Sequence, residues 1–187
     1  MSGAGKSTVC RIFSEHGYSV IDCDVSAREV VEIGYNSLME LENELSPEVI
    51  LPDGTLDRRK TAELIFNDVD KRMTFNRIIY PYITHNVIGK IKAADCDVLL
   101  DAPTLYDARL EGICDEIVSV CADIDVCIER IMARDGISEE LARARLGSQH
   151  DIGWYKEHSS HCIVNNGSVE ALYDEAESII SKLKGIR

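Results

Sequence analysis

The sequence predicts an α/β fold in which helices cover both faces of a parallel sheet. Short apolar runs such as "CDVLLDAP" and "DEIVSVCA" alternate with amphipathic stretches along the chain. Polarity does not alternate residue by residue within these runs, which is typical of parallel strands buried on both faces. Since strands that alternate with helices are joined by right-handed crossovers, we expect a doubly wound parallel sheet.

Length and composition are those of one globular domain. The chain has 187 residues, of which 45% are hydrophobic, enough to build a core. Its net charge of −13 repels nucleic acid and anionic membranes on average, so an anionic ligand must be held by a local cluster of donors. Without a long apolar run or a signal-peptide pattern, we expect a cytoplasmic protein that binds neither nucleic acid nor membrane, as a monomer or a weak homo-oligomer.

Seven cysteines are present, an odd number with no C-x-x-C pair. This pattern argues against a disulfide framework and against a structural zinc site. Most of the cysteines lie among apolar residues and are expected to be buried thiols. His158, His161 and Cys162 lack further ligands at metal-binding spacing, so no metal site is expected there.

The chain is expected to begin with a helix, a strand and a second helix. Residues 7–16 carry apolar side chains on one face and are followed by Gly17, which predicts a helix that ends at the glycine. The next segment, "YSVID", predicts a short buried strand. Residues 25–45 are expected to be helical.

A turn and another helix follow. Pro52, Asp53 and Gly54 mark the turn, and Asp57 is a candidate N-cap for the helix after it. A further helix is expected from about residue 68 to residue 94, broken or bent near Pro81.

The C-terminal half alternates strands and helices. "CDVLLDAP" and "DEIVSVCA" predict two strands, and "CIVNN" a last one. Residues 124–134 and 138–149 predict two helices around the turn "RDGIS", and residues 168–184 a terminal helix.

The segment "GAGKST" supplies the second half of a phosphate-binding loop, whose pattern is G-x-x-x-x-G-K-[ST]. Backbone N–H groups from Ser2 to Ser7 are expected to wrap phosphates, and the Lys6 ammonium to reach the β and γ oxygens. The Ser7 hydroxyl is expected to bind Mg²⁺. The following helix adds partial positive charge at its N-terminus. The nucleotide-binding residues expected in this loop are Ser2, Gly3, Ala4, Gly5, Lys6, Ser7 and Thr8.

The first glycine of the pattern would precede Met1, and so would the strand that usually leads into such a loop. We expect that Met1 is an internal methionine and that a misassigned start codon or a truncation removed the first strand. The chain as written is then expected to fold poorly or to bind nucleotide weakly, because burial of such a strand contributes on the order of 10 kcal/mol. Upstream bases that encode about five apolar residues ending in glycine would support this expectation, and a stop codon directly before Met1 would oppose it.

The segment "VIDCDVSAREVV" carries the candidate base for phosphoryl transfer. A carboxylate can orient an acceptor hydroxyl and take its proton, a role that we assign to Asp24. Asp22 is a candidate water-mediated Mg²⁺ group, and Arg28, one helical turn on, is placed to bind an anionic end of the acceptor.

Together these segments resemble the dephospho-coenzyme A kinase family over nearly the whole chain. The likeness rests on several motifs in the family's order: "GAGKST", "VIDCDVSAREVV", "DGTLDRRKTAELIF", "IIYPYI", "VLLDAPTLYD", "CDEIVSV", "CIERIMARDGISEELARARLGSQ" and "IVNNG". The resemblance implies transfer of the ATP γ-phosphate to the 3′-hydroxyl of dephospho-coenzyme A, with Mg²⁺. It also implies a single P-loop kinase domain, with a helical acceptor-binding lobe within about residues 25–95 and a small lid at about 130–150.

The resemblance also assigns roles to residues outside the loop. Asp24 becomes the base, and Arg58, in "DGTLDRR", belongs to the acceptor lobe. Arg134 and Arg145 belong to the lid, where guanidinium groups can neutralise the transferring phosphoryl group. Asn165 and Gly167 lie in the loop that borders the adenine.

Asp101 and Pro103 follow a predicted central strand. By position and by likeness, Asp101 is expected to hold Mg²⁺ through water or to brace the phosphate-binding loop, and Pro103 to turn the chain into the acceptor lobe. Two departures concern the acceptor side, since family members commonly carry histidine where this chain has Tyr80, and glutamate where it has Asp107. A third lies near Ser160, where an acidic residue is common.

Three other functions remain open at this point. A nucleotide, nucleoside or shikimate kinase would share the loop, the lid and the sheet. A GTP-driven switch would normally carry an N-K-x-D motif, whereas "VNNG" lacks the lysine and the aspartate. The third alternative is a nucleotide-binding protein that is inactive because its first strand is missing.

Overall fold

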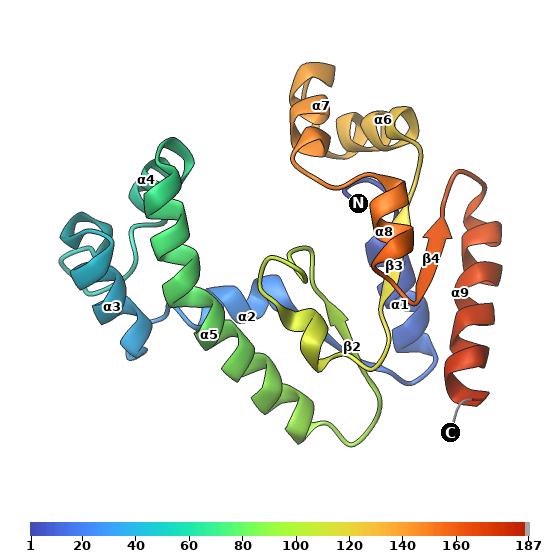
Figure 1. The fold of residues 1–187 in the computed structure, drawn as a ribbon, viewed down its shortest axis with the longest axis horizontal. Coiled ribbons are helices and arrows are strands. Elements are labelled where there is room, and N and C mark those ends of the chain that lie inside the picture. Colours follow the sequence, from blue (N-terminus) through green and yellow to red (C-terminus); the bar gives the residue numbers. More distant parts are fainter. Residues whose placement is uncertain (186–187) are drawn as a thin grey trace. The chain divides into compact units, whose positions relative to one another are not determined.

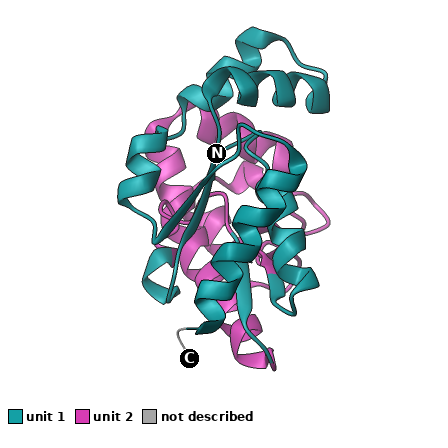
Figure 2. Ribbon diagram, turned by 90° about the vertical axis from the view of Figure 1, so that its right-hand side faces the viewer, with its two compact units in different colours: residues 1–20, 96–101, 111–187 teal, residues 21–95, 102–110 magenta. Residues whose placement is uncertain are grey.

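The computed structural model describes residues 1–185, which form two compact units (Figures 1 and 2). Unit 1 contains residues 1–20, 96–101 and the described residues from 111 onward. Unit 2 contains residues 21–95 and 102–110. The predicted phosphate-binding loop and the predicted lid therefore belong to unit 1, and the segment predicted to bind the acceptor belongs to unit 2.

Unit 1 is a mixed α/β structure. Its strands pair as two separate two-stranded sheets, β1–β2 and β3–β4. The β3–β4 pair is parallel, with Val118 opposite His161 and Cys121 opposite Val164. The unit boundary falls inside β1, whose first residue, Ser19, donates a hydrogen bond of 2.8 Å to the carbonyl of Asp97. The elements are α1 (Lys6–Glu15), β1 (Ser19–Asp22), β2 (Val98–Asp101), η2 (Leu110–Ile113), β3 (Val118–Cys121), α6 (Ile124–Asp135), α7 (Glu139–Gly147), α8 (Ile152–Glu157), β4 (His161–Val164) and α9 (Val169–Gly185).

The core of unit 1 joins the phosphate-binding loop to the helices around it. Helix α1 packs on α9 and β2, α9 packs on β4, and α8 packs on β3 and β4. Burial of these apolar side chains is the main term that stabilises the unit. The fully or almost fully buried members include Ala4, Ile12, Phe13, Ile131, Ile163 and Ile180.

Unit 2 is helical. Its longest helix, α5 (Val69–Ala93), contacts α2, α3 and α4, so these shorter helices share one partner (Figure 1). The side chains of Ile78, Ile79, Ile83 and Val87 give α5 its buried face. The shorter elements are α2 (Cys23–Glu29), α3 (Asn36–Glu44), η1 (Pro47–Val49) and α4 (Arg58–Asn67).

The structure confirms the mixed α/β class and corrects three local predictions. The helix predicted over 25–45 is two helices, because the chain turns between α2 and α3 at Gly34, whose φ is +98°. Of the two outcomes expected at Pro81, a break or a bend, the break does not occur, because α5 runs continuously through this exposed residue and packing along α5 outweighs the lost hydrogen bond. Helix α8 was not predicted, because six residues are too few to show a periodic pattern.

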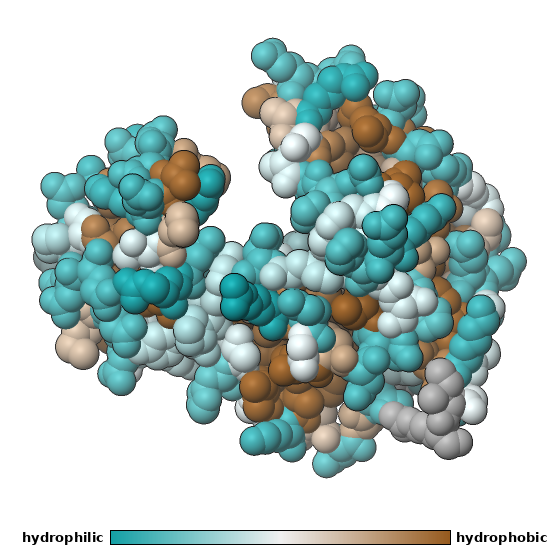
Figure 3. Space-filling view, in the orientation of Figure 1, coloured by the Kyte–Doolittle hydropathy of each residue, from teal (hydrophilic) through white to brown (hydrophobic). Residues whose placement is uncertain are grey.

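Hydrophilic residues predominate on the face drawn in Figure 3, with smaller hydrophobic areas between them. Within the described part of the chain, none of the helices combines the length and the hydrophobicity that a membrane span requires.

Candidate active site

The predicted phosphate-binding loop, which leads into α1, contains two glycines that no other residue could replace without strain. Gly5 is the N-cap of α1 with φ of +100°, and no side chain caps this helix end. A Cβ on Gly5 would lie 2.7 Å from the side-chain nitrogen of Asn165. Gly3 has φ of +75°, and a Cβ there would lie 2.7 Å from the carbonyl oxygen of Cys127 on α6. Both glycines are therefore fixed by backbone conformation and by close approach.

Lys6 lies in the first turn of α1 and forms an ion pair with Asp101 at the end of β2. The two side chains are partly exposed, at 36% for Lys6 and 19% for Asp101. The predicted phosphate-binding lysine and the predicted Mg²⁺-linked aspartate are thus brought together. Ser7 is exposed beside them, and Thr8 completes the first turn with a hydrogen bond of 3.0 Å from its N–H to the carbonyl of Gly5.

Hydrogen bonds from the side chains of Asn165 and Arg130 connect this loop to the predicted adenine loop. Asn165 donates from Nδ2 to the carbonyl of Ala4 at 2.8 Å, and both residues are buried. Arg130 on α6 donates from Nη1 to the carbonyl of Asn165 at 3.0 Å and to that of Gly3 at 3.5 Å. Sequence reasoning missed Arg130, although it lies one helical turn before Arg134 on the same helix. Gly167 follows in the same loop, before α9 begins.

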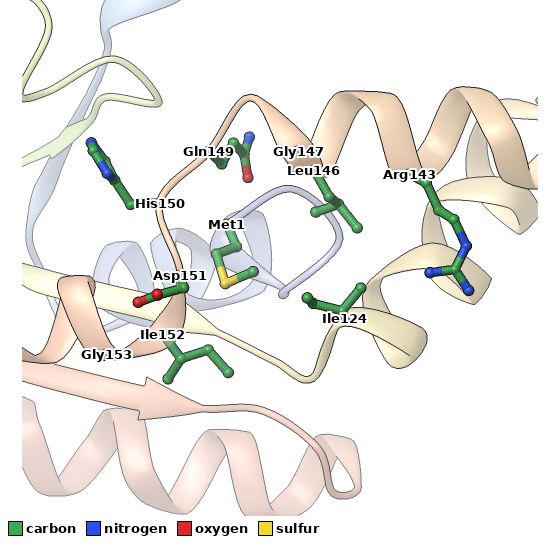
Figure 4. A pocket seen from close by; sticks show the side chains of 10 residues that line it. All are labelled: Met1, Ile124, Arg143, Leu146, Gly147, Gln149, His150, Asp151, Ile152 and Gly153. Carbon is green, nitrogen blue, oxygen red and sulfur yellow. The ribbon is translucent and has the colours of Figure 1, made fainter.

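Gln149, which follows α7, forms two hydrogen bonds with Ser2 in the predicted phosphate-binding loop. Its Oε1 accepts from the backbone N–H of Ser2 at 2.9 Å, and its Nε2 donates to the Ser2 hydroxyl at 2.8 Å. This residue also was missed, although "GSQ" lies within a motif that carries the resemblance. Gln149 is one of the residues that line a cavity of about 560 Å³. Figure 4 shows it with other lining residues, among them Met1, Leu146, Ile124 and Ile152. The cavity therefore borders both the loop and the segment that leaves α7.

The two predicted lid arginines share one carboxylate. Arg134, near the end of α6, donates from Nε and Nη2 to the two oxygens of Asp135 at 2.7 and 2.9 Å. Arg145, on α7, donates from Nη1 to Asp135 Oδ2 at 2.5 Å. Hydrogen bonds from Arg134 and then from Arg145 lower the pKa of Asp135 to about 2. Asp135 is a third residue that the sequence did not single out.

The predicted acceptor residues lie in unit 2. Asp24 is exposed in the first turn of α2, where its backbone N–H donates to Asp22 Oδ1 at 2.8 Å. Asp22 is thus the N-cap of α2, whose helix begins directly at Cys23, and no extended strand runs through Asp24. Arg28 is exposed in the last turn of the same helix, and Arg58 is exposed at the start of α4.

Of the two further acceptor candidates in unit 2, one lies beside the 102–110 segment and the other within it. Tyr80, on α5, is half-buried, and burial followed by the nearby Asp107 carboxylate raises the pKa of its phenol above the usual range. Tyr80 and Asp107, the two departures from the family pattern on the acceptor side, are therefore neighbours. Pro103 is exposed just after β2.

The sequence of the chain matches a known protein family over most of its length. The family model for dephospho-CoA kinase matches residues 2–171. The chain belongs to the dephospho-CoA kinase family. A dephospho-CoA kinase of Enterococcus faecalis is 36% identical over 169 residues, which cover 89% of this chain and 85% of that protein. One from Oryza sativa is 30% identical, over 95% of this chain and 79% of its own length.

Solved structures resemble the chain over almost its whole length. The Thermus thermophilus protein TT1252 has a TM-score of 0.82 at 29% identity, covering 97% of this chain and 93% of that one. A dephospho-CoA kinase from Campylobacter jejuni, at 23% identity, shares the fold with a TM-score of 0.70 and covers 98% and 94% of the two chains. The predicted family and enzyme class, an ATP-dependent kinase of coenzyme A synthesis, are confirmed by the family matches.

Proposed function

We propose that this chain transfers the γ-phosphate of ATP to the 3′-hydroxyl of dephospho-coenzyme A, as a cytoplasmic enzyme with no nucleic-acid partner. The observation that carries the proposal is the ion pair between Lys6 and Asp101 beside the uncapped N-terminus of α1. A lysine held there meets β and γ phosphate oxygens, and the open N–H groups of the helix end add positive potential. The family match supports dephospho-coenzyme A as the acceptor.

The nucleotide would occupy unit 1. Residues 2–8 would bind its phosphates, and Asn165 and Gly167 would border the adenine. Arg130 supports this arrangement because it ties the two loops together through Gly3 and Asn165. We further propose that the lid covers about residues 130–150 and contributes Arg134 and Arg145, whose guanidinium groups would neutralise charge on the transferring phosphoryl group.

The oxygen donors near Lys6 fit a magnesium ion. Mg²⁺ usually takes one or two protein oxygens and fills its other positions with water and phosphate oxygens. The exposed Ser7 hydroxyl would bind it directly and the Asp101 carboxylate through water. No group of three or more His, Cys, Asp or Glu side chains that could form a metal cage occurs within residues 1–185, which agrees with an ion carried by the nucleotide. The ion would supply charge neutralisation on the phosphates.

Asp24 would act as the general base. The proton of the 3′-hydroxyl passes to the Asp24 carboxylate while the oxygen attacks the γ-phosphorus, and ADP leaves with the bond electrons. Asp24 is exposed at the start of α2, so it is accessible to an acceptor. The helical unit 2, within about residues 25–95, would form the acceptor lobe, with Arg28, Arg58, Tyr80 and Pro103 as contacts.

We also propose that the strands belong to a doubly wound sheet of the P-loop kinase type.

The test is ADP release in a coupled assay with dephospho-coenzyme A, a mononucleotide, a nucleoside and shikimate offered separately. We expect turnover with dephospho-coenzyme A, and a loss of several orders of magnitude in kcat for Lys6→Ala and for Asp24→Asn. Asp70→Asn is the matched control for the second variant, because Asp70 is likewise an exposed acid in the first turn of a helix. Faster turnover of another acceptor would overturn the assigned substrate, and near-normal kcat in Asp24→Asn would remove the assigned base.

A further inference from the structure

The Asp135 carboxylate is the centre of a small cluster that spans α6 and α7. It accepts two hydrogen bonds from Arg134 and one from Arg145. Its side chain is 24% exposed, whereas the side chains of Arg134 and Arg145 are 60% and 44% exposed. The two guanidinium groups thus partly cover the carboxylate and remain accessible themselves.

Helix α6 alone gives no reason for an aspartate at this position. Asp135 is the last residue of α6, where a carboxylate meets the negative end of the helix dipole. The helix already ends through Gly136, whose left-handed conformation, with φ of +64°, needs no aspartate side chain. What favours the carboxylate is the arginine pair, one member from each helix.

The contacts leave donors on both arginines available. A guanidinium has five N–H donors in a fixed plane. Asp135 occupies one edge of Arg134, through Nε and Nη2, and a single nitrogen of Arg145. Within residues 1–185, these two side chains form no other hydrogen bond or ion pair. Each can therefore bind an anion without first releasing Asp135.

We propose that Asp135 is a positioning residue that holds Arg134 and Arg145 side by side, so that both can bind phosphate oxygens of ATP. The inference rests on the proposed function of the same site. Without the carboxylate, the two cations repel each other and each long side chain samples many rotamers. Nucleotide binding would then have to order both side chains, and this loss of conformational freedom would weaken the affinity for ATP.

The first experiment compares Asp135→Asn with the wild type and with Asp125→Asn. Asp125 is a matched control, because it lies on α6 and pairs with an α7 arginine, Arg143, at 3.5 Å, while its side chain is 88% exposed. We expect Asp135→Asn to weaken ATP binding, measured by calorimetry, by about tenfold, with a similar loss in kcat/KM. Asp125→Asn should bind ATP like the wild type, and Asp135→Glu should recover part of the loss. Circular dichroism and the unfolding midpoint verify that each variant is folded.

A double-mutant cycle separates positioning from a merely structural role. If Asp135 acts through Arg134 and Arg145, adding Asp135→Asn to a variant that carries both Arg134→Ala and Arg145→Ala should not weaken ATP binding further. Effects that multiply, or wild-type or tighter ATP affinity in Asp135→Asn, would overturn the inference. ATP binding is measured without an acceptor, so absence of dephospho-coenzyme A phosphorylation by the wild type would refute the proposed function and leave this comparison intact.

Discussion

The side-chain amide of Asn165 donates a hydrogen bond of 2.8 Å to the backbone carbonyl of Ala4, which lies 161 positions earlier in the chain. Asn165 is 8% exposed and Ala4 is fully buried. The same amide nitrogen lies only 2.7 Å from the position that a Cβ on Gly5 would take. One asparagine after β4 therefore helps to fix the position of the predicted phosphate-binding loop, together with Arg130 and Gln149.

Replacing Asn165 with alanine should destabilise the protein and weaken nucleotide binding together. The variant leaves the buried Ala4 carbonyl without its donor, which costs about 1–3 kcal/mol in the free energy of unfolding. Urea unfolding and ATP calorimetry on the same samples measure the two effects. Asn67→Ala is the control, because Asn67 makes a comparable amide-to-carbonyl bond to Glu63 that is exposed. Equal losses of stability in the two variants would contradict the role given to burial.

Two glycines with similar backbone conformations should respond differently to alanine. Gly3 and Gly17 have φ of +75° and +91°, so Gly→Ala strains the backbone at both, at a cost of order 1–3 kcal/mol. At Gly3 the new methyl also meets the Cys127 carbonyl at 2.7 Å, whereas at Gly17 nothing lies within 4 Å. Gly3→Ala should therefore lower the unfolding midpoint more than Gly17→Ala. A smaller drop for Gly3→Ala would show that the loop moves away from α6 at little cost.

Elements set by local signals could be predicted from the sequence. The apolar face of residues 7–16 and the glycine after it predicted both ends of α1 to within one residue. Asp57 was a candidate N-cap, and it caps α4 by accepting a hydrogen bond from the Lys60 N–H. The pairing of Lys6 with Asp101 agrees with their expected positions at a helix start and a strand end. Each of these predictions depends on a few neighbouring residues or on a short motif.

Contacts that join distant segments could not be predicted in this way. Arg130 and Gln149 gain their roles only when α6 and the segment after α7 meet the N-terminal loop. Asp135 looks like an ordinary charged residue at a helix end until Arg145 approaches from α7. Pro81 shows the opposite case, because packing along α5 overrode a strong local signal for a break.

Cysteine reactivity should follow burial. Burial, and then the neighbouring Cys162 thiol at 3.8 Å, raise the pKa of Cys121 to about 12, and burial also raises the pKa of Cys127. Since the thiolate is the reactive form, we expect iodoacetamide at pH 8 to label exposed Cys96 quickly and to leave Cys121 and Cys127 unlabelled until the protein unfolds. Mass spectrometry of labelled peptides measures this, and rapid labelling of Cys121 in folded protein would contradict it.

The Asp135 cluster should stay ionised far into the acid range. The folded-state pKa of about 2 lies below the ordinary value of 3.8, so the folded protein binds fewer protons at this site than the unfolded chain. The contribution of Asp135 to stability is therefore present above pH 3.8 and is lost as the pH falls through 2. Carboxyl-carbon NMR should place the Asp135 midpoint close to 2, and replacing Arg134 and Arg145 together with alanine should move it toward 3.8. An Asp135 midpoint that the double substitution leaves unchanged would show that the arginines are not its cause.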